Sequence, residues 1–92
     1  MQLQLTGQNI EITDSLREFT NSKFQRLLRH SDRITNIHVV LAVDKLLHVA
    51  EANVHIPGAD LHAKSESDDM HKSILNIIAK LLRQIEKHKD KH

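Results

Sequence analysis

A row of basic side chains near the C-terminus is the feature of this sequence best suited to chemistry, and that chemistry is phosphate binding. Spacings of four, four, three and four residues place five residues, all basic except Asn76, in one stripe along a helix: Lys72, Asn76, Lys80, Arg83 and Lys87. Residues 80–92 carry five basic residues against two acidic ones, whereas residues 34–79 carry three against six. This uneven charge indicates a polyanionic partner on one side of the fold, although solvated helix faces would give the same balance.

A second basic group lies in an expected helix from about Asp14 to Arg29. Lys23 projects near the middle of the apolar face of this helix, and Arg26 and Arg29 lie along one edge of it. Burying an unpaired ammonium is expensive, so Lys23 either extends its charged end to water over a buried stem or contacts a partner. Spacing alone leaves these two readings open. If the helices pack side by side, Lys23 would emerge in a groove between them, beside the basic stripe of the last helix.

The sequence gives little support for a metal site or for catalysis. Of the eight histidines, His38, His55 and His62 point to one face of the expected sheet, but no pair has the helical zinc spacing and cysteine is absent. We interpret them as isolated polar histidines, with no metal and no cofactor. The carboxylates are scattered, and no glycine-rich phosphate loop or nucleophile elbow occurs. We therefore expect a protein that is not an enzyme and has no catalytic residues.

Aromatic residues suited to stacking on bases are missing. The chain has no tryptophan and no tyrosine, and its two phenylalanines, Phe19 and Phe24, fall on the apolar face of the first helix. Single-strand recognition by base stacking is therefore disfavoured. What remains for a nucleic-acid partner is folded RNA, recognised by its shape and its phosphates.

The elements that must position these residues are two helices and four strands. Seven apolar residues at helical spacing predict a last helix from Ser67, a good N-cap, to about Lys91. Thr13 is expected to begin the first helix, with Ser15 and Glu18 as a rival capping box. Alternating apolar residues predict four strands: Gln2–Thr6, Ile34–Asp44, His48–Ile56 and Leu61–Lys64.

The order β-α-β-β-β-α predicts an α+β fold. The first two strands should pair in parallel across a right-handed crossover, and the later strands should form an antiparallel meander. The economical packing is a two-layer sandwich with both helices on one face of a four-stranded sheet. Ninety-two residues suit a single domain spanning residues 1–92. Because there is no membrane-length apolar run, no signal peptide and no cysteine, we expect a cytoplasmic protein.

Several segments of the chain match the pattern of a known family. They are Ile12–Phe19, Lys23–Leu27, His38–Leu41, Asp69-Met70 and Lys80–Lys91. Together they resemble the short-form ribosome hibernation promoting factors of bacteria, whose close relative is the ribosome-associated inhibitor also called protein Y. The similarity covers essentially the whole chain. The ending KLxRQxxKHKxK is fairly specific, whereas the strands are generic.

The resemblance implies a β-α-β-β-β-α fold akin to double-stranded-RNA-binding domains. It also implies binding to the ribosomal RNA of the small subunit, in the channel used by messenger and transfer RNA. The positions that match basic residues of the family are Lys23, Arg26, Lys80, Arg83, Lys87 and Lys89. Arg29 is added to this rRNA-binding set from the charge pattern alone. The partners implied are the small subunit and a second hibernation factor, and we expect no membrane partner and a monomer away from the ribosome.

Two residues depart from the family pattern. Ser31 stands where relatives often carry an aromatic residue, and His71 stands where tyrosine is usual.

The chain ends at His92, which favours short-form behaviour, namely promotion of inactive ribosome dimers in stationary phase or stress. One alternative is inhibition of single ribosomes without dimer formation. Another, from a different class, is a protein that binds and modulates a transcription (sigma) factor.

Overall fold

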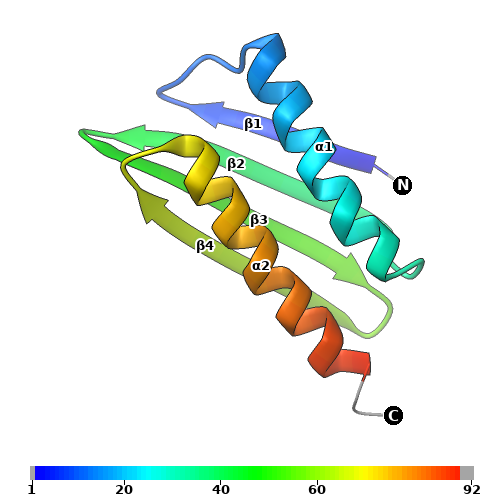
Figure 1. Cartoon of the computed structure of the whole chain (residues 1–92). Helices are drawn as coiled ribbons and strands as arrows, with labels where there is room; N and C mark the ends of the chain where they lie inside the picture. Colours follow the sequence, from blue (N-terminus) through cyan, green and yellow to red (C-terminus); the bar gives the residue numbers. More distant parts are fainter. Residues whose placement is uncertain (1, 90–92) are drawn as a thin grey trace.

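The computed structural model describes residues 2–89, except for the side chains of Gln2 and Lys89 (Figure 1). Its elements follow the predicted β-α-β-β-β-α order, which is thereby confirmed. They are β1 (Gln2–Gln8), α1 (Asp14–His30), β2 (Asn36–Asp44), β3 (Leu47–Ile56), β4 (Ala59–Ser67) and α2 (Met70–Lys89). No helix within residues 2–89 is long and apolar enough to span a bilayer.

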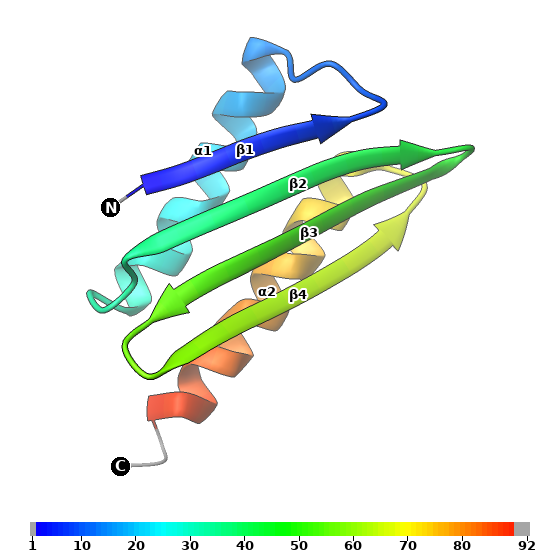
Figure 2. The same cartoon turned by 180° about the vertical axis from the view of Figure 1, so that it is seen from behind.

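The four strands form one sheet in the order β1-β2-β3-β4. β1 pairs with β2 in parallel, and the β2–β3 and β3–β4 pairs are antiparallel, as predicted. Both helices cover the same face of the sheet, which leaves its other face open (Figures 1 and 2). The two-layer α+β sandwich is therefore confirmed, and it leaves β4 as one edge of the sheet, beneath α2.

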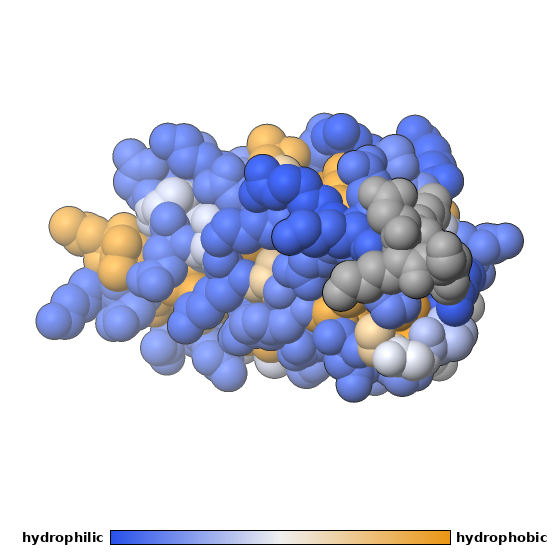
Figure 3. Space-filling model, turned by 90° about the horizontal axis from the view of Figure 1, so that it is seen from below, coloured by the Kyte–Doolittle hydropathy of each residue, from blue (hydrophilic) through white to orange (hydrophobic). Residues whose placement is uncertain are grey.

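The core lies between this sheet and the helices, because each element turns one apolar face inward. Ile37, Val39 and Leu41 alternate along β2 and are fully buried, and so is Phe24 of α1. Thr20 is also fully buried, and its hydroxyl donates to the backbone oxygen of Leu16 at 2.8 Å, which satisfies it. Seen from below in Figure 3, the outer surface is largely hydrophilic.

The two hairpin turns of the sheet need left-handed backbone conformations. Gly58 in the β3–β4 turn has φ 85°, which glycine adopts without steric cost. Lys45 in the β2–β3 turn has φ 58°, a conformation that is uncommon for a residue with a side chain. Next to it, Leu46 is 88% exposed at the tip of the hairpin.

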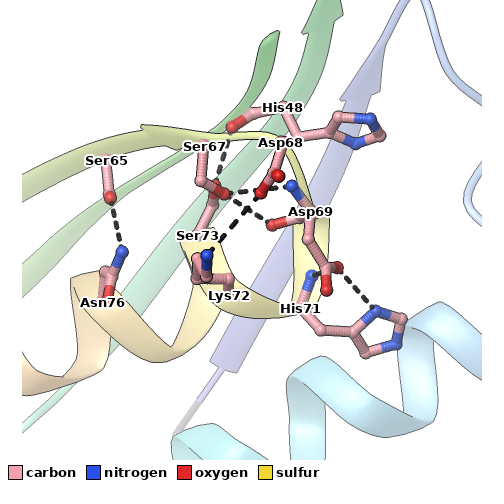
Figure 4. Close-up of polar contacts among 9 residues, drawn as sticks. All are labelled: His48, Ser65, Ser67, Asp68, Asp69, His71, Lys72, Ser73 and Asn76. Atoms are coloured by element: carbon pink, nitrogen blue, oxygen red, sulfur yellow. Dashed lines mark hydrogen bonds and ion pairs between the residues drawn. The ribbon is translucent and has the colours of Figure 1, made fainter. Parts of the chain in front are cut away.

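The end of β4 and the start of α2 differ from the sequence prediction. β4 continues to Ser67 rather than ending at Lys64, because residues 65–67 pair with β3. Asp69, and not Ser67, accepts a hydrogen bond from the first turn of α2, at 2.9 Å from the amide nitrogen of His71 (Figure 4). Lys91, the expected end of this helix, lies outside the described residues. At α1 the prediction is confirmed, since the hydroxyl of Thr13 accepts from Leu16 N at 3.1 Å.

A buried serine ties the start of α2 to β3. Ser73 is fully buried, and its hydroxyl donates to the backbone oxygen of His48 at 2.7 Å (Figure 4). Its oxygen also lies 2.6 Å from the hydroxyl oxygen of Ser67 at the end of β4. The position of α2 on the sheet is therefore set by specific polar contacts as well as by apolar packing.

Candidate nucleic-acid interface

The basic stripe of α2 lies next to β4 and not next to α1. Lys80 Nζ donates to the backbone oxygen of Lys64 in β4 at 2.7 Å. One turn further along α2, Gln84 Nε2 donates to the backbone oxygen of His62, also at 2.7 Å. α1 packs against a different flank of α2, the one that carries His71. The expectation that this stripe joins the basic residues of α1 in a groove between the helices is therefore wrong.

A groove runs instead between α2 and β4, with a volume of about 450 Å³. We call it the α2–β4 groove, and the described residues that line it are His62, Ala63, Lys64, Lys80, Arg83, Gln84 and Lys87. Four of these residues are basic and none is acidic. Lys80, Arg83 and Lys87 are exposed to solvent. β4 and α2 form the lower edge of the molecule in Figure 1, so Figure 3 looks onto this side. The groove concentrates positive charge in a concave surface, which attracts anions.

Lys23 lies where α1 meets α2, as the sequence suggested. Its side chain is half-buried, and its Nζ lies 5.5 Å from the ring centroid of Phe19. The Phe19 ring in turn packs edge-on against His71 at the start of α2, with the ring centroids 4.3 Å apart. The ammonium is thus stabilised by an aromatic face. His71 supplies an aromatic ring at this helix junction.

The other basic residues of α1 point to solvent. Arg26 and Arg29 are both exposed. Helical geometry places Arg26 beside Lys23, and Arg29 further from α2 on the outer surface of α1. These cations and the α2–β4 groove therefore lie on opposite flanks of α2. Lys89 belongs to the last turn of α2, but its side chain is outside the described part of the chain.

The histidines on the open face of the sheet do not come together. Each has a different hydrogen-bond partner: Thr6 Oγ1 at 3.2 Å for His38, Asp60 Oδ1 at 2.6 Å for His55, and Glu51 Oε2 at 2.6 Å for His62. Among residues 2–89, no group of three or more metal-ligating side chains could hold a metal ion. These three histidines therefore belong to separate polar pairs.

A second hollow, of about 540 Å³, lies where both helices begin. Its lining includes the acidic residues Glu11, Asp68 and Asp69, so it does not suit a polyanion. The amide of His71 donates a hydrogen bond to the carboxylate of Asp69 and is the main cause that lowers the pKa of Asp69 below its usual value. This carboxylate caps α2 in its charged form.

Among the groove residues that the sequence analysis did not assign to the site are Gln84 and Lys64. Gln84 is uncharged, so a search for basic residues passed over it, and Lys64 lies on a strand distant in sequence from the stripe. A signal for Gln84 was available, because it lies four residues after Lys80 and therefore on the same flank of the helix.

Comparison with known proteins identifies relatives over almost the whole chain. A family model described as "Sigma 54 modulation protein / S30EA ribosomal protein" matches residues 3–92. The chain is 48% identical over 91 residues to the ribosome hibernation promoting factor of Escherichia coli strain K12. That alignment covers 99% of this chain and 96% of the relative.

Two solved structures are similar to this fold. A ribosomal subunit interface protein from Coxiella burnetii has a TM-score of 0.93 and 41% sequence identity, with 99% of this chain and 100% of that chain covered. The N-terminal domain of Thermus thermophilus Protein Y has a TM-score of 0.85 and 30% identity, with 92% of this chain and 94% of that chain covered.

Proposed function

We propose that this chain, which belongs to the sigma 54 modulation protein / S30EA ribosomal protein family, is a ribosome hibernation factor that binds the small ribosomal subunit. It is a cytoplasmic protein that acts by binding and not by catalysis. Its ligand is the ribosomal RNA of the channel used by messenger and transfer RNA. The residues proposed to contact this RNA are Lys23, Arg26, Arg29, Lys80, Arg83, Lys87 and Lys89.

The single observation that carries this proposal is the α2–β4 groove. Four basic residues surround a concave surface whose described lining contains no carboxylate. Lysine and arginine side chains bind phosphates by charge and by N–H donors, without regard to base identity. Phe24 is fully buried and Phe19 packs against His71, so neither phenylalanine is free to stack on a base. Phosphate contacts should therefore dominate binding.

Occupation of the channel explains how such a protein would inhibit translation. A domain bound there excludes messenger and transfer RNA by volume, so no chemical step is needed. Because the contacts are electrostatic and noncovalent, binding is reversible and falls with increasing salt. With a second hibernation factor, the bound small subunits would assemble into inactive ribosome dimers.

Co-sedimentation with purified ribosomal subunits tests the proposal. We expect the protein to travel with small subunits at low salt, to be released log-linearly as salt rises, and to leave large subunits unoccupied. Sedimentation with neither subunit would contradict the proposal and favour the alternative, a protein-binding modulator of a sigma factor. Gradient profiles of whole ribosomes with the second factor separate promotion of dimers from inhibition of single ribosomes.

A further inference from the structure

Two side chains of α2 are held in place by the free edge of β4. Lys80 Nζ and Gln84 Nε2 each donate to a backbone oxygen of this strand at 2.7 Å. The acceptors belong to Lys64 and His62, which are two residues apart, so both carbonyls point to the same side of β4. β4 pairs only with β3, so this side is the unpaired edge of the sheet. The bonds cap that edge and fix the direction of both side chains.

Each of these donors keeps N–H groups for a ligand. An ammonium has three N–H groups and the nitrogen of a side-chain amide has two. After one bond to β4, Lys80 therefore retains two donors and Gln84 retains one. Both side chains line the α2–β4 groove together with Lys64, Arg83 and Lys87. A side chain that is already oriented loses less rotamer freedom on binding than a mobile one.

We infer that the α2–β4 groove holds a phosphodiester of the RNA backbone, and that the neutral amide of Gln84 is one of its ligands beside the ammonium of Lys80. The inference rests on the ribosome-binding function proposed above and names one contact within it. A backbone phosphate fits the groove because its free oxygens accept from the amide and the ammonium together. Lys23 lies on the other flank of α2 and does not share this phosphate.

The substitution Gln84→Met tests the inference, because methionine keeps the length of the side chain and removes its N–H donors. Affinity for purified small subunits is measured over a series of salt concentrations. We expect affinity to fall about tenfold, as for the loss of one hydrogen bond to a charged group. The salt dependence should stay unchanged, because no charge is removed.

Two further variants serve as matched controls. Lys87→Met removes a charge from the same groove, so it should weaken binding and reduce the slope of log affinity against log salt by about 0.7–0.9. Gln4→Met changes an exposed glutamine of β1 on the open face of the sheet and should bind as wild type does. All affinities are measured well below the melting temperature of each variant, so that a loss of folded protein does not account for weaker binding.

Wild-type affinity in Gln84→Met would overturn the inference, and weak binding by Lys87→Met in the same experiment would leave the proposed function standing. A reduced salt slope in Gln84→Met would also overturn it, because the substitution would then have displaced a cation. If the wild-type chain fails to bind small subunits at low salt, the proposed function and the inference both fail.

Discussion

Replacing Lys80 and Arg83 separately by methionine should distinguish the contribution of the basic stripe to stability from its contribution to RNA binding. Lys80 Nζ donates to an edge carbonyl of β4 at 2.7 Å. Within residues 2–89, the guanidinium group of Arg83 makes no hydrogen bond or ion pair. Both side chains line the α2–β4 groove and are exposed. We therefore expect both substitutions to weaken binding and only Lys80→Met to lower stability.

The size of each effect follows from these contacts. Water can replace Lys80 at an exposed carbonyl, so its bond contributes about 0.5–1 kcal/mol to the free energy of unfolding. In a domain of this size, that corresponds to a fall in melting temperature of about 2–8 °C. For binding, each variant loses one phosphate contact, so the slope of log affinity against log salt should decrease by about 0.7–0.9. Affinity itself should fall roughly tenfold.

Thermal melts followed by circular dichroism and titrations of small subunits at several salt concentrations give both quantities. Equal melting temperatures of Lys80→Met and the wild-type protein would refute the edge-capping role. An unchanged salt slope in Arg83→Met would refute the assignment of the groove to phosphate.

Three further predictions concern residues outside the α2–β4 groove. Lys23→Met removes a cation–π contact with Phe19 but keeps the apolar stem, so the free energy of unfolding should change by no more than about 1 kcal/mol. The affinity of this variant for small subunits should fall about tenfold. Wild-type affinity would limit Lys23 to a structural role. Ser73→Ala removes the hydroxyl that donates to the backbone oxygen of His48 and should lower the free energy of unfolding by about 1–3 kcal/mol. Urea titration measures this change, and an unchanged midpoint would contradict the prediction. Because the pKa of Asp69 is lowered in the folded protein, its charged carboxylate stabilises the fold at pH values above the usual pKa of 3.8, and this stabilisation is lost as the pH falls below 3.8. Asp69→Asn should therefore lose less stability on acidification than the wild-type protein. Parallel curves of stability against pH for the two proteins would exclude this linkage.

The strands and helices could be predicted because burial imposes a period on the sequence. Ile37, Val39 and Leu41 alternate with more exposed residues, which is what a strand with one open face requires. The end of β4 was missed because Ser65–Ser67 is polar and reads as a loop, whereas pairing with β3 keeps it in the sheet. With the end of β4 misplaced, the sequence prediction put the cap of α2 at Ser67, two residues before the observed cap, Asp69.

The candidate site could be predicted in part, for a geometric reason. Spacing fixes the angle of Lys80, Arg83 and Lys87 around the axis of α2. It does not say which neighbour lies on each flank, because that depends on where the helix crosses the sheet. In the structure, α1 packs on the flank of α2 that carries His71, and the basic stripe lies on the other flank, next to β4. Gln84 could not be found from charge because its side chain is neutral. Its contact could not be predicted either, because the carbonyl that it binds belongs to β4, which is distant in the sequence.

A structure of this protein bound to the small ribosomal subunit would show directly whether the α2–β4 groove binds ribosomal RNA. We predict backbone phosphates of ribosomal RNA within hydrogen-bonding distance of Lys80, Arg83 and Gln84, with the open face of the sheet turned away from the RNA. A complex in which the open sheet face contacts the subunit and the α2–β4 groove faces solvent would contradict the account.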